Sequence, residues 1–189
     1  MKKPILHTAF ALVALLAGSA ALAQPYLGVS AGRSDFQADC AGAASCDTTD
    51  AGYKLYGGYM LNEHLGVEAA LFDFGKARGS VVLPGSNAVT VEARARGLGL
   101  YGVAALPIDA FSVFAKAGFA YTQAKVELSG ALAGSDDEWK LTPAFGVGAS
   151  YTFTRNLGAR IEWERVRVEF PGAQKEDADL ISAGVTYRF

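Results

Sequence analysis

Histidine is scarce in this chain of 189 residues, and the scarcity limits the chemistry that the chain can perform. The two histidines are His7 and His64. His7 lies in an N-terminal leader, and His64 lies in a predicted turn without a nearby serine, so neither is placed as a general base. Glu162 and Glu164 put two acids on one face of a predicted strand, but nothing beside them selects a sugar or a phosphate. We therefore expect no enzymatic activity and no catalytic residue.

An excess of positive charge is also missing, because 17 lysines and arginines face 19 aspartates and glutamates. A protein that binds nucleic acid would need a basic excess, so we expect no nucleic-acid partner. Although 51% of the residues are hydrophobic, the chain after its leader has no apolar run of the roughly 20 residues that a membrane helix needs. The 22 glycines, 11 phenylalanines and 8 tyrosines instead suit many short strands that carry aromatic side chains.

The N-terminus has the three parts of a secretory signal peptide. Lys2 and Lys3 precede an apolar run over 9–17, and Ala21-Leu-Ala23 has the small residues of a cleavage site. The run is too short for a membrane anchor. This pattern predicts a signal peptide over residues 1–23 and a single mature domain over residues 24–189.

Cysteine is as scarce as histidine, and Cys40 and Cys46 are the only two. They lie close together in a stretch of small and polar residues without partner ligands, so we expect no metal site and no cofactor. Because export leads to an oxidising compartment, we predict a disulfide between them. Closing so short a loop would stabilise the fold by roughly 2 kcal/mol in the entropic model.

The end of the chain shows the clearest periodicity. Apolar side chains at 181, 183, 185, 187 and 189 alternate with small or polar ones, which is the two-residue repeat of a strand. Similar segments with turn signals between them recur along the chain. We predict eight strands, over residues 26–36, 52–60, 65–78, 89–106, 111–128, 139–153, 157–170 and 180–189.

The predicted connections alternate in length, with about three or four residues after the second, fourth and sixth strands and longer, polar segments after the others. Outer-membrane barrels have such short periplasmic turns and long external loops, whereas a β-sandwich gives no reason for the alternation. Because only closed barrels let strands span lipid, we predict an all-β fold: an eight-stranded antiparallel up-and-down transmembrane β-barrel. Its expected location is the outer membrane of a Gram-negative bacterium.

Two features of the strands need explanation. Pro143 cannot donate to a ladder, so we expect a local bulge there, toward the external end of its strand. The face of Arg94 and Arg96 is ambiguous, because they can point into the lumen or stand above the membrane on the lipid side. We favour the lipid side, since Leu98 and Leu100 share it.

Four stretches, 57–68, 142–151, 160–163 and 184–189, resemble the OmpA-type outer-membrane β-barrel family. The resemblance covers the mature chain and implies an eight-stranded barrel rather than an activity. It also implies that Tyr187 and Phe189 form a C-terminal signal, which the barrel-assembly machinery reads after periplasmic chaperones deliver the chain. Many relatives continue into a domain that grips peptidoglycan. This chain ends at Phe189, so we expect no peptidoglycan-binding domain.

The family has a network of charges inside the barrel, and part of it matches here. Glu68 and Arg160 stand at matching positions, whereas Ser30, Val103 and Ser150 replace charged residues. The inward faces of our predicted strands supply other charges. We therefore expect an interior network of Lys54, Glu68, Lys116, Arg160 and Glu162.

Eight strands leave an interior that side chains can fill. We therefore expect a non-enzymatic barrel with a structural or surface-interaction role through its external loops. The alternative is a narrow, gated channel for ions or small solutes through the interior charges. The expected partners are outer-membrane lipid, lipopolysaccharide and an external ligand at the loops, where acidic runs occur at 135–138 and 174–177.

Overall fold

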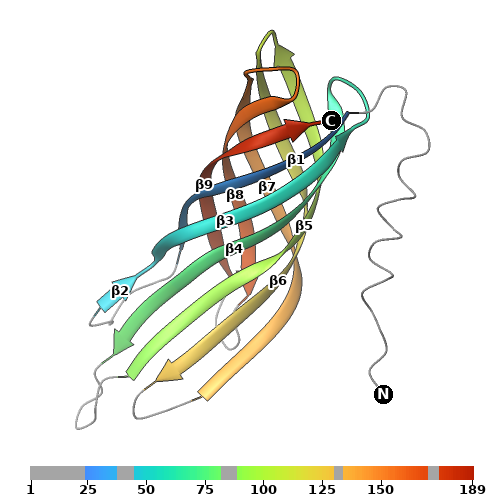
Figure 1. The fold of residues 1–189 in the computed structure, drawn as a ribbon. Coiled ribbons are helices and arrows are strands. Elements are labelled where there is room, and N and C mark those ends of the chain that lie inside the picture. Colours follow the sequence, from blue (N-terminus) through green and yellow to red (C-terminus); the bar gives the residue numbers. More distant parts are fainter. Residues whose placement is uncertain (1–23, 38–44, 82–88, 130–133, 170–174) are drawn as a thin grey trace, which may run out of the picture.

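The strands of the computed structural model run side by side around a tilted cylinder (Figure 1). The structure describes residues 24–37, 45–81, 89–129, 134–169 and 175–189. The predicted signal peptide, Cys40 and therefore the predicted disulfide lie outside these residues. The strands are β1 (Gln24–Phe36), β2 (Ser45–Asp47), β3 (Thr49–Met60), β4 (Leu65–Val81), β5 (Val89–Ile108), β6 (Phe111–Ser129), β7 (Gly134–Thr152), β8 (Leu157–Glu169) and β9 (Lys175–Arg188).

The sheet closes on itself. From β3 to β9 each strand pairs antiparallel with the next one along the chain, and β1 pairs with both β3 and β9. The three-residue β2 pairs with β4 beyond the end of the β3–β4 ladder, so it extends an existing position of the barrel rather than adding one. The predicted eight-stranded antiparallel barrel is confirmed. None of the described residues forms a helix with the length and apolar character needed to cross a bilayer.

Several strands run further than the sequence indicated, at the end of the barrel away from Gln24 and Phe189. We expected a loop through residue 137, but β7 begins at Gly134 and pairs with β6 to its first residue. Likewise, β9 begins at Lys175 inside a stretch that we expected to be a connection. These expectations were wrong because we read strands from alternating hydrophobicity. Outside the bilayer the outer face of a strand meets water and carries polar side chains, so the alternation that lipid imposes fades while the ladder continues.

Pro143 also corrects an expectation. The β6–β7 ladder runs through the Phe119–Pro143 pair without a shift of register, so there is no bulge. On the other side, the β7–β8 ladder ends at the next pair, Ala144 with Val166. Proline lacks an N–H group, and it stands where one of its two neighbouring ladders has stopped.

A bulge does occur in β4, where the register against β5 shifts between Asp73 and Lys76. Gly75 has φ +72°, a left-handed conformation that glycine adopts without strain. A carboxylate oxygen of Asp50 accepts a hydrogen bond from the Lys76 backbone N–H at 2.8 Å, which fixes the turn of the chain. Because of the extra residue, the even-numbered positions of β4 change from the inner face to the outer face.

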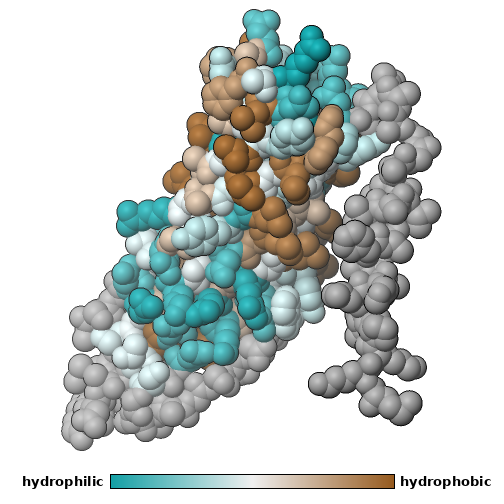
Figure 2. All heavy atoms as spheres, in the orientation of Figure 1, coloured by the Kyte–Doolittle hydropathy of each residue, from teal (hydrophilic) through white to brown (hydrophobic). Residues whose placement is uncertain are grey.

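The outer surface carries an apolar belt. Brown, hydrophobic spheres form a band across the upper part of the barrel, with teal, hydrophilic spheres at the upper tip and toward the lower end (Figure 2). Large exposed side chains such as Leu100, Phe119 and Ile161 are 61–62% accessible. Side chains of this kind are stable at a surface only when lipid covers it.

Aromatic residues mark the rim beside the short turns. Tyr151 and Phe153 contact each other edge to face with ring centroids 5.2 Å apart, and Tyr187 and Phe189 do so at 5.1 Å. Phe111 packs against Tyr151 at 4.6 Å. This girdle places the end with Gln24 and Phe189 at the periplasmic interface, because outer-membrane barrels have their short turns there.

Candidate functional site: a charged layer inside the barrel

The inner wall carries a closed set of charges. Among the described residues, all of the buried charged side chains belong to it, namely Lys54, Glu68, Lys116, Arg160, Glu162 and Glu164. We call these residues the interior charge network. They come from β3, β4, β6 and β8, and each lies on the inner face because of the two-residue repeat of its strand. Three positive and three negative charges cancel.

The two lysines are held by the glutamates of β8. Lys54 Nζ lies 2.6 Å from Glu162 Oε1 and 2.8 Å from Glu164 Oε2. Lys116 Nζ lies 2.6 Å from Glu162 Oε1 and 2.9 Å from Glu164 Oε2, and it also contacts Glu68 Oε1 at 3.1 Å. The Tyr101 hydroxyl donates to Glu164 Oε1 at 2.5 Å. The Glu164 carboxylate therefore links β8 to β3, β5 and β6.

Arg160 joins the two remaining glutamates. Its guanidinium lies 2.5 Å from Glu68 Oε2 and 2.5 Å from Glu162 Oε2. The Tyr26 hydroxyl donates to Glu68 Oε2 at 3.0 Å. The guanidinium also lies over the ring of Phe114, with its carbon 4.1 Å from the centroid. These contacts connect β1, β4, β6 and β8 across the lumen.

An apolar layer lies beyond the charges, toward the external end. Its side chains point inward from the far halves of their strands and are almost fully buried; among them are Phe36, Phe72, Phe74, Val166, Val168 and Leu180. Phe72 and Phe74 contact each other edge to face at 5.1 Å, and Phe36 contacts Phe74 at 6.3 Å. Two successive layers therefore fill the lumen: the paired charges, and beyond them the packed apolar side chains.

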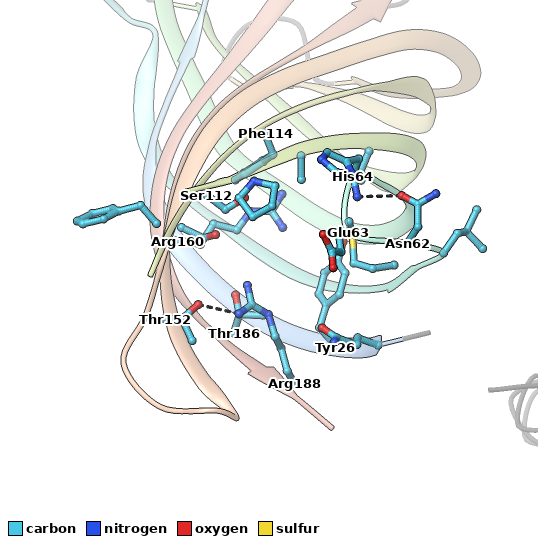
Figure 3. Close-up of a pocket in the computed structure, with 18 of the residues that line it drawn as sticks. Tyr26, Asn62, Glu63, His64, Ser112, Phe114, Thr152, Arg160, Thr186 and Arg188 are labelled. Atoms are coloured by element: carbon cyan, nitrogen blue, oxygen red, sulfur yellow. Dashed lines mark hydrogen bonds between the residues drawn. The ribbon is translucent and has the colours of Figure 1, made fainter. Parts of the chain in front are cut away.

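A cavity of about 700 Å³ lies at the periplasmic end of the lumen (Figure 3). Its walls include Tyr26, Phe114 and Arg160 on the inner side and His64 and Arg188 near the rim. The exposed His64 donates its backbone N–H to Asn62 Oδ1 at 2.8 Å, which shapes the β3–β4 turn. Arg188 donates to Thr152 Oγ1 at 2.7 Å. Arg160 closes the cavity, so its inner end is the edge of the interior charge network.

The structure brings together all five residues that the sequence placed in the network, and it adds one that we missed. Glu164 was noted as the neighbour of Glu162 on one strand face but was not included. The signal was present, since Arg160, Glu162 and Glu164 follow at intervals of two on β8. Tyr26 and Tyr101 were also missed, because an inward tyrosine on a barrel strand carries no local sign that its hydroxyl meets a carboxylate.

The replaced positions of the family pattern also lie inside. Ser30 and Val103 are buried, and Ser150 lines the cavity. The sequence also left the face of Arg94 and Arg96 open. Ala95 between them is fully buried and Arg96 is exposed, so both arginines are on the outer side. Among the described residues, no group of three or more histidine, cysteine, aspartate or glutamate side chains is arranged to hold a metal ion.

A closed antiparallel barrel with an apolar outer belt and a filled, charged interior defines an integral outer-membrane β-barrel. The family model described as "Outer membrane protein beta-barrel domain" matches residues 8–189, and the chain belongs to this family. Its location is therefore the Gram-negative outer membrane, as predicted. A search of curated protein sequences finds no match to this chain.

Solved outer-membrane barrels share the fold. The attachment invasion locus protein Ail of Yersinia pestis, in complex with the heparin analogue sucrose octasulfate, has a TM-score of 0.60 and 16% identity, over 89% of this chain and 99% of that one. Neisserial surface protein A has a TM-score of 0.58 and 15% identity, over 87% and 97%. OprG of Pseudomonas aeruginosa has a TM-score of 0.53 and 15% identity, over 91% and 98%. Identities this low establish a common fold and leave the function to be argued from the site.

Proposed function

We propose that this protein is a sealed barrel without catalytic activity that acts through its external surface. The observation that carries the proposal is the doubly filled lumen, in which the interior charge network and the apolar layer follow one another. An ion crossing this path would have to separate paired, buried charges and then pass between apolar side chains, and both steps are costly. The barrel then serves as a scaffold, and the strand ends and loops outside the membrane bind the protein's partners.

The shape of the external end supports a role at the surface. The strands continue well past the apolar belt, where the outer face is hydrophilic (Figure 2). One structural neighbour, Ail, is described as an attachment protein and was solved with a heparin analogue. For this chain we propose an external ligand at the loops, together with assembly through Tyr187 and Phe189 by the barrel-assembly machinery and periplasmic chaperones.

A narrow channel is the second candidate, and the periplasmic cavity favours it. The cavity already opens about 700 Å³ of the lumen up to Arg160. A rearrangement of the interior charge network would extend this opening toward the outside. Glu68 is the residue to test, because it contacts both Arg160 and Lys116.

Single-channel recording of the refolded mature chain in a planar bilayer separates the two candidates. We expect no discrete openings from the wild type, because the apolar layer remains closed. Glu68→Ala should also be silent when its folding is verified by heat-resistant migration in gel electrophoresis. Glu63→Gln, which lines the cavity outside the network, is the matched control. Discrete openings in the wild type that change with Glu68→Ala, but not with Glu63→Gln, would establish the channel and end the proposal.

The surface role is tested by replacing the segments between the external strand ends. A variant with Gly-Ser linkers in place of residues 82–88 and 130–133 should keep its heat-resistant fold, because the ladders on either side are unchanged. It should fail to restore an attachment or susceptibility phenotype in a strain that lacks the chain, whereas Glu63→Gln should restore it. Full restoration by the loop variant, together with loss in the Glu68→Ala variant, would place the function in the lumen.

A further inference from the structure

A group of positive side chains stands on the outer wall just beyond the apolar belt. Lys76 and Arg78 follow the bulge of β4, and Arg94 and Arg96 lie on β5; we call these four the outer cationic cluster. The ladder pairs Lys76 with Arg94. Leu98, two residues from Arg96 on the same face, belongs to the apolar belt. The cluster therefore lies at the external edge of the lipid-facing surface.

One cation of the cluster has no carboxylate partner among the described residues. Glu92 is shared by three cations, with Lys76 Nζ at 2.8 Å, Arg78 Nε at 3.2 Å and Arg94 at 3.4 Å. Arg96 makes no ion pair with a described residue, and its Nε donates a 2.8 Å hydrogen bond to Gln123. Asp73, which stands opposite Arg96 in the ladder, instead accepts the Gly75 backbone N–H. Arg96 is therefore the guanidinium of the cluster that is open to an anionic ligand.

On the opposite wall, by contrast, both arginines are paired with carboxylates. On β8 and β9, Arg165 makes two 2.7 Å bonds to the carboxylate of Asp179. Arg167 Nε lies 3.2 Å from Asp177. Two arginines and two aspartates balance there, at positions that are also outside the apolar belt. The balanced wall supplies a matched comparison for the outer cationic cluster.

An apolar groove in the lipid-facing wall adjoins the cluster at Arg96. It has a volume of about 620 Å³, and its walls include Leu55, Leu71 and Leu98, with Arg96 and Trp139 among its other lining residues. Its polar and charged lining residues are Ser30, Lys54, Asp73 and Arg96. A groove of this kind in the lipid-facing wall suits a hydrocarbon chain, and the guanidinium beside it suits an anionic head group.

We propose that the outer cationic cluster and this groove form a binding site for lipopolysaccharide, with lipid A phosphates on Arg94 and Arg96 and an acyl chain in the groove. The site lies at the level of the outer leaflet, where the lipids carry phosphates on a sugar head group. Guanidinium groups bind phosphate through paired, charge-assisted hydrogen bonds. Several cations in a row along two strands fit a head group with more than one phosphate.

The test uses the refolded mature chain in zwitterionic detergent, titrated with lipopolysaccharide whose lipid A phosphates are intact or have been removed enzymatically. Wild type should bind the phosphorylated form at least about tenfold more tightly, and Arg94→Gln with Arg96→Gln should reduce that affinity about tenfold, since charge-assisted contacts are lost. Arg165→Gln with Arg167→Gln should leave the affinity unchanged. Arg96→Gln alone, which gives up a single side-chain bond to Gln123, provides a milder variant if the double variant does not fold.

Three outcomes overturn the proposal. Equal affinity of wild type and the folded cluster variants would show that these arginines do not contact the head group. Equal losses in the Arg165 and Arg167 variant would show that the net charge of the barrel is responsible. Equal binding of the phosphorylated and dephosphorylated forms, or of an anionic phospholipid in their place, would show that the site does not recognise lipid A phosphates.

Discussion

Glu164 is the residue on which most of the interior depends. It accepts from Lys54, Lys116 and Tyr101, and its side chain is 1% exposed. A buried carboxylate in this position is stable only because cations and a hydroxyl surround it. Conversely, the two lysines are stable in the lumen because the carboxylates of Glu164 and Glu162 lie within 2.9 Å of them. Each buried charge is therefore stabilised by the others, and we expect a single substitution in the network to lower the stability of the fold strongly.

We predict that Glu164→Gln destabilises the barrel by about 3–5 kcal/mol, because it leaves the buried interior charge network with three cations and only two carboxylates. The measurement is urea-induced unfolding of the protein in lipid vesicles. Glu127→Gln is the control, since Glu127 is exposed and pairs with Lys125 at the surface. Equal unfolding free energies for the two variants would show that the network contributes no more than a surface pair.

At the scale of elements, the bulge of β4 decides which side chains face lipid. Before Asp73 the odd positions point outward, and after Lys76 the even positions do. Side chains alternate between the two faces of a strand, so one inserted residue exchanges the inner and outer faces for all residues that follow it. Without the bulge, Lys76 and Arg78 would point into the apolar layer instead of standing beside Glu92. The bulge therefore keeps the inner layer apolar and assembles the outer cationic cluster.

Gly75→Ala should destabilise the fold by about 1–2 kcal/mol, the cost of a left-handed conformation for a residue with a Cβ. Its Cβ would also lie 2.7 Å from the Ala51 carbonyl oxygen, which adds a steric penalty. The matched control is Gly102→Ala, where the added Cβ would meet its nearest neighbour, the Ala117 carbonyl oxygen, at 3.9 Å. Denaturant unfolding in vesicles compares the two. A stable Gly75→Ala variant would mean that the bulge can move along β4.

At the scale of the whole molecule, the two ends of the barrel differ in a way that fixes its orientation. The end with Gln24 and Phe189 has the aromatic rim, the short turns and the open cavity, while the other end has strands that rise beyond the apolar belt (Figures 1 and 2). Because the short turns of outer-membrane barrels are periplasmic, the extended strands and the outer cationic cluster face the outside of the cell.

Labelling of intact cells tests this orientation. In a background with Cys40 and Cys46 replaced by serine, Asp47→Cys in β2 should react with a membrane-impermeant maleimide. Asp109→Cys, in the β5–β6 turn, should react only after the outer membrane is permeabilised. The reverse labelling pattern would show that the barrel has the opposite orientation. The outer cationic cluster would then not face the outer leaflet, and the proposed lipopolysaccharide site would lose its basis.

The sequence by itself determined the strands, their order and their faces, because a two-residue repeat is a local property that each strand shows alone. It also indicated the charges that point inward, since an inward face follows from the register. The tertiary structure decided which of these charges meet, as Lys54 and Glu164 are 110 residues apart and come together only when the barrel closes. It likewise decided the bulge at Gly75, the end of the β7–β8 ladder at Pro143 and the strand extensions beyond the bilayer. These features depend on partner strands and on water rather than on hydrophobic alternation, so no local pattern records them.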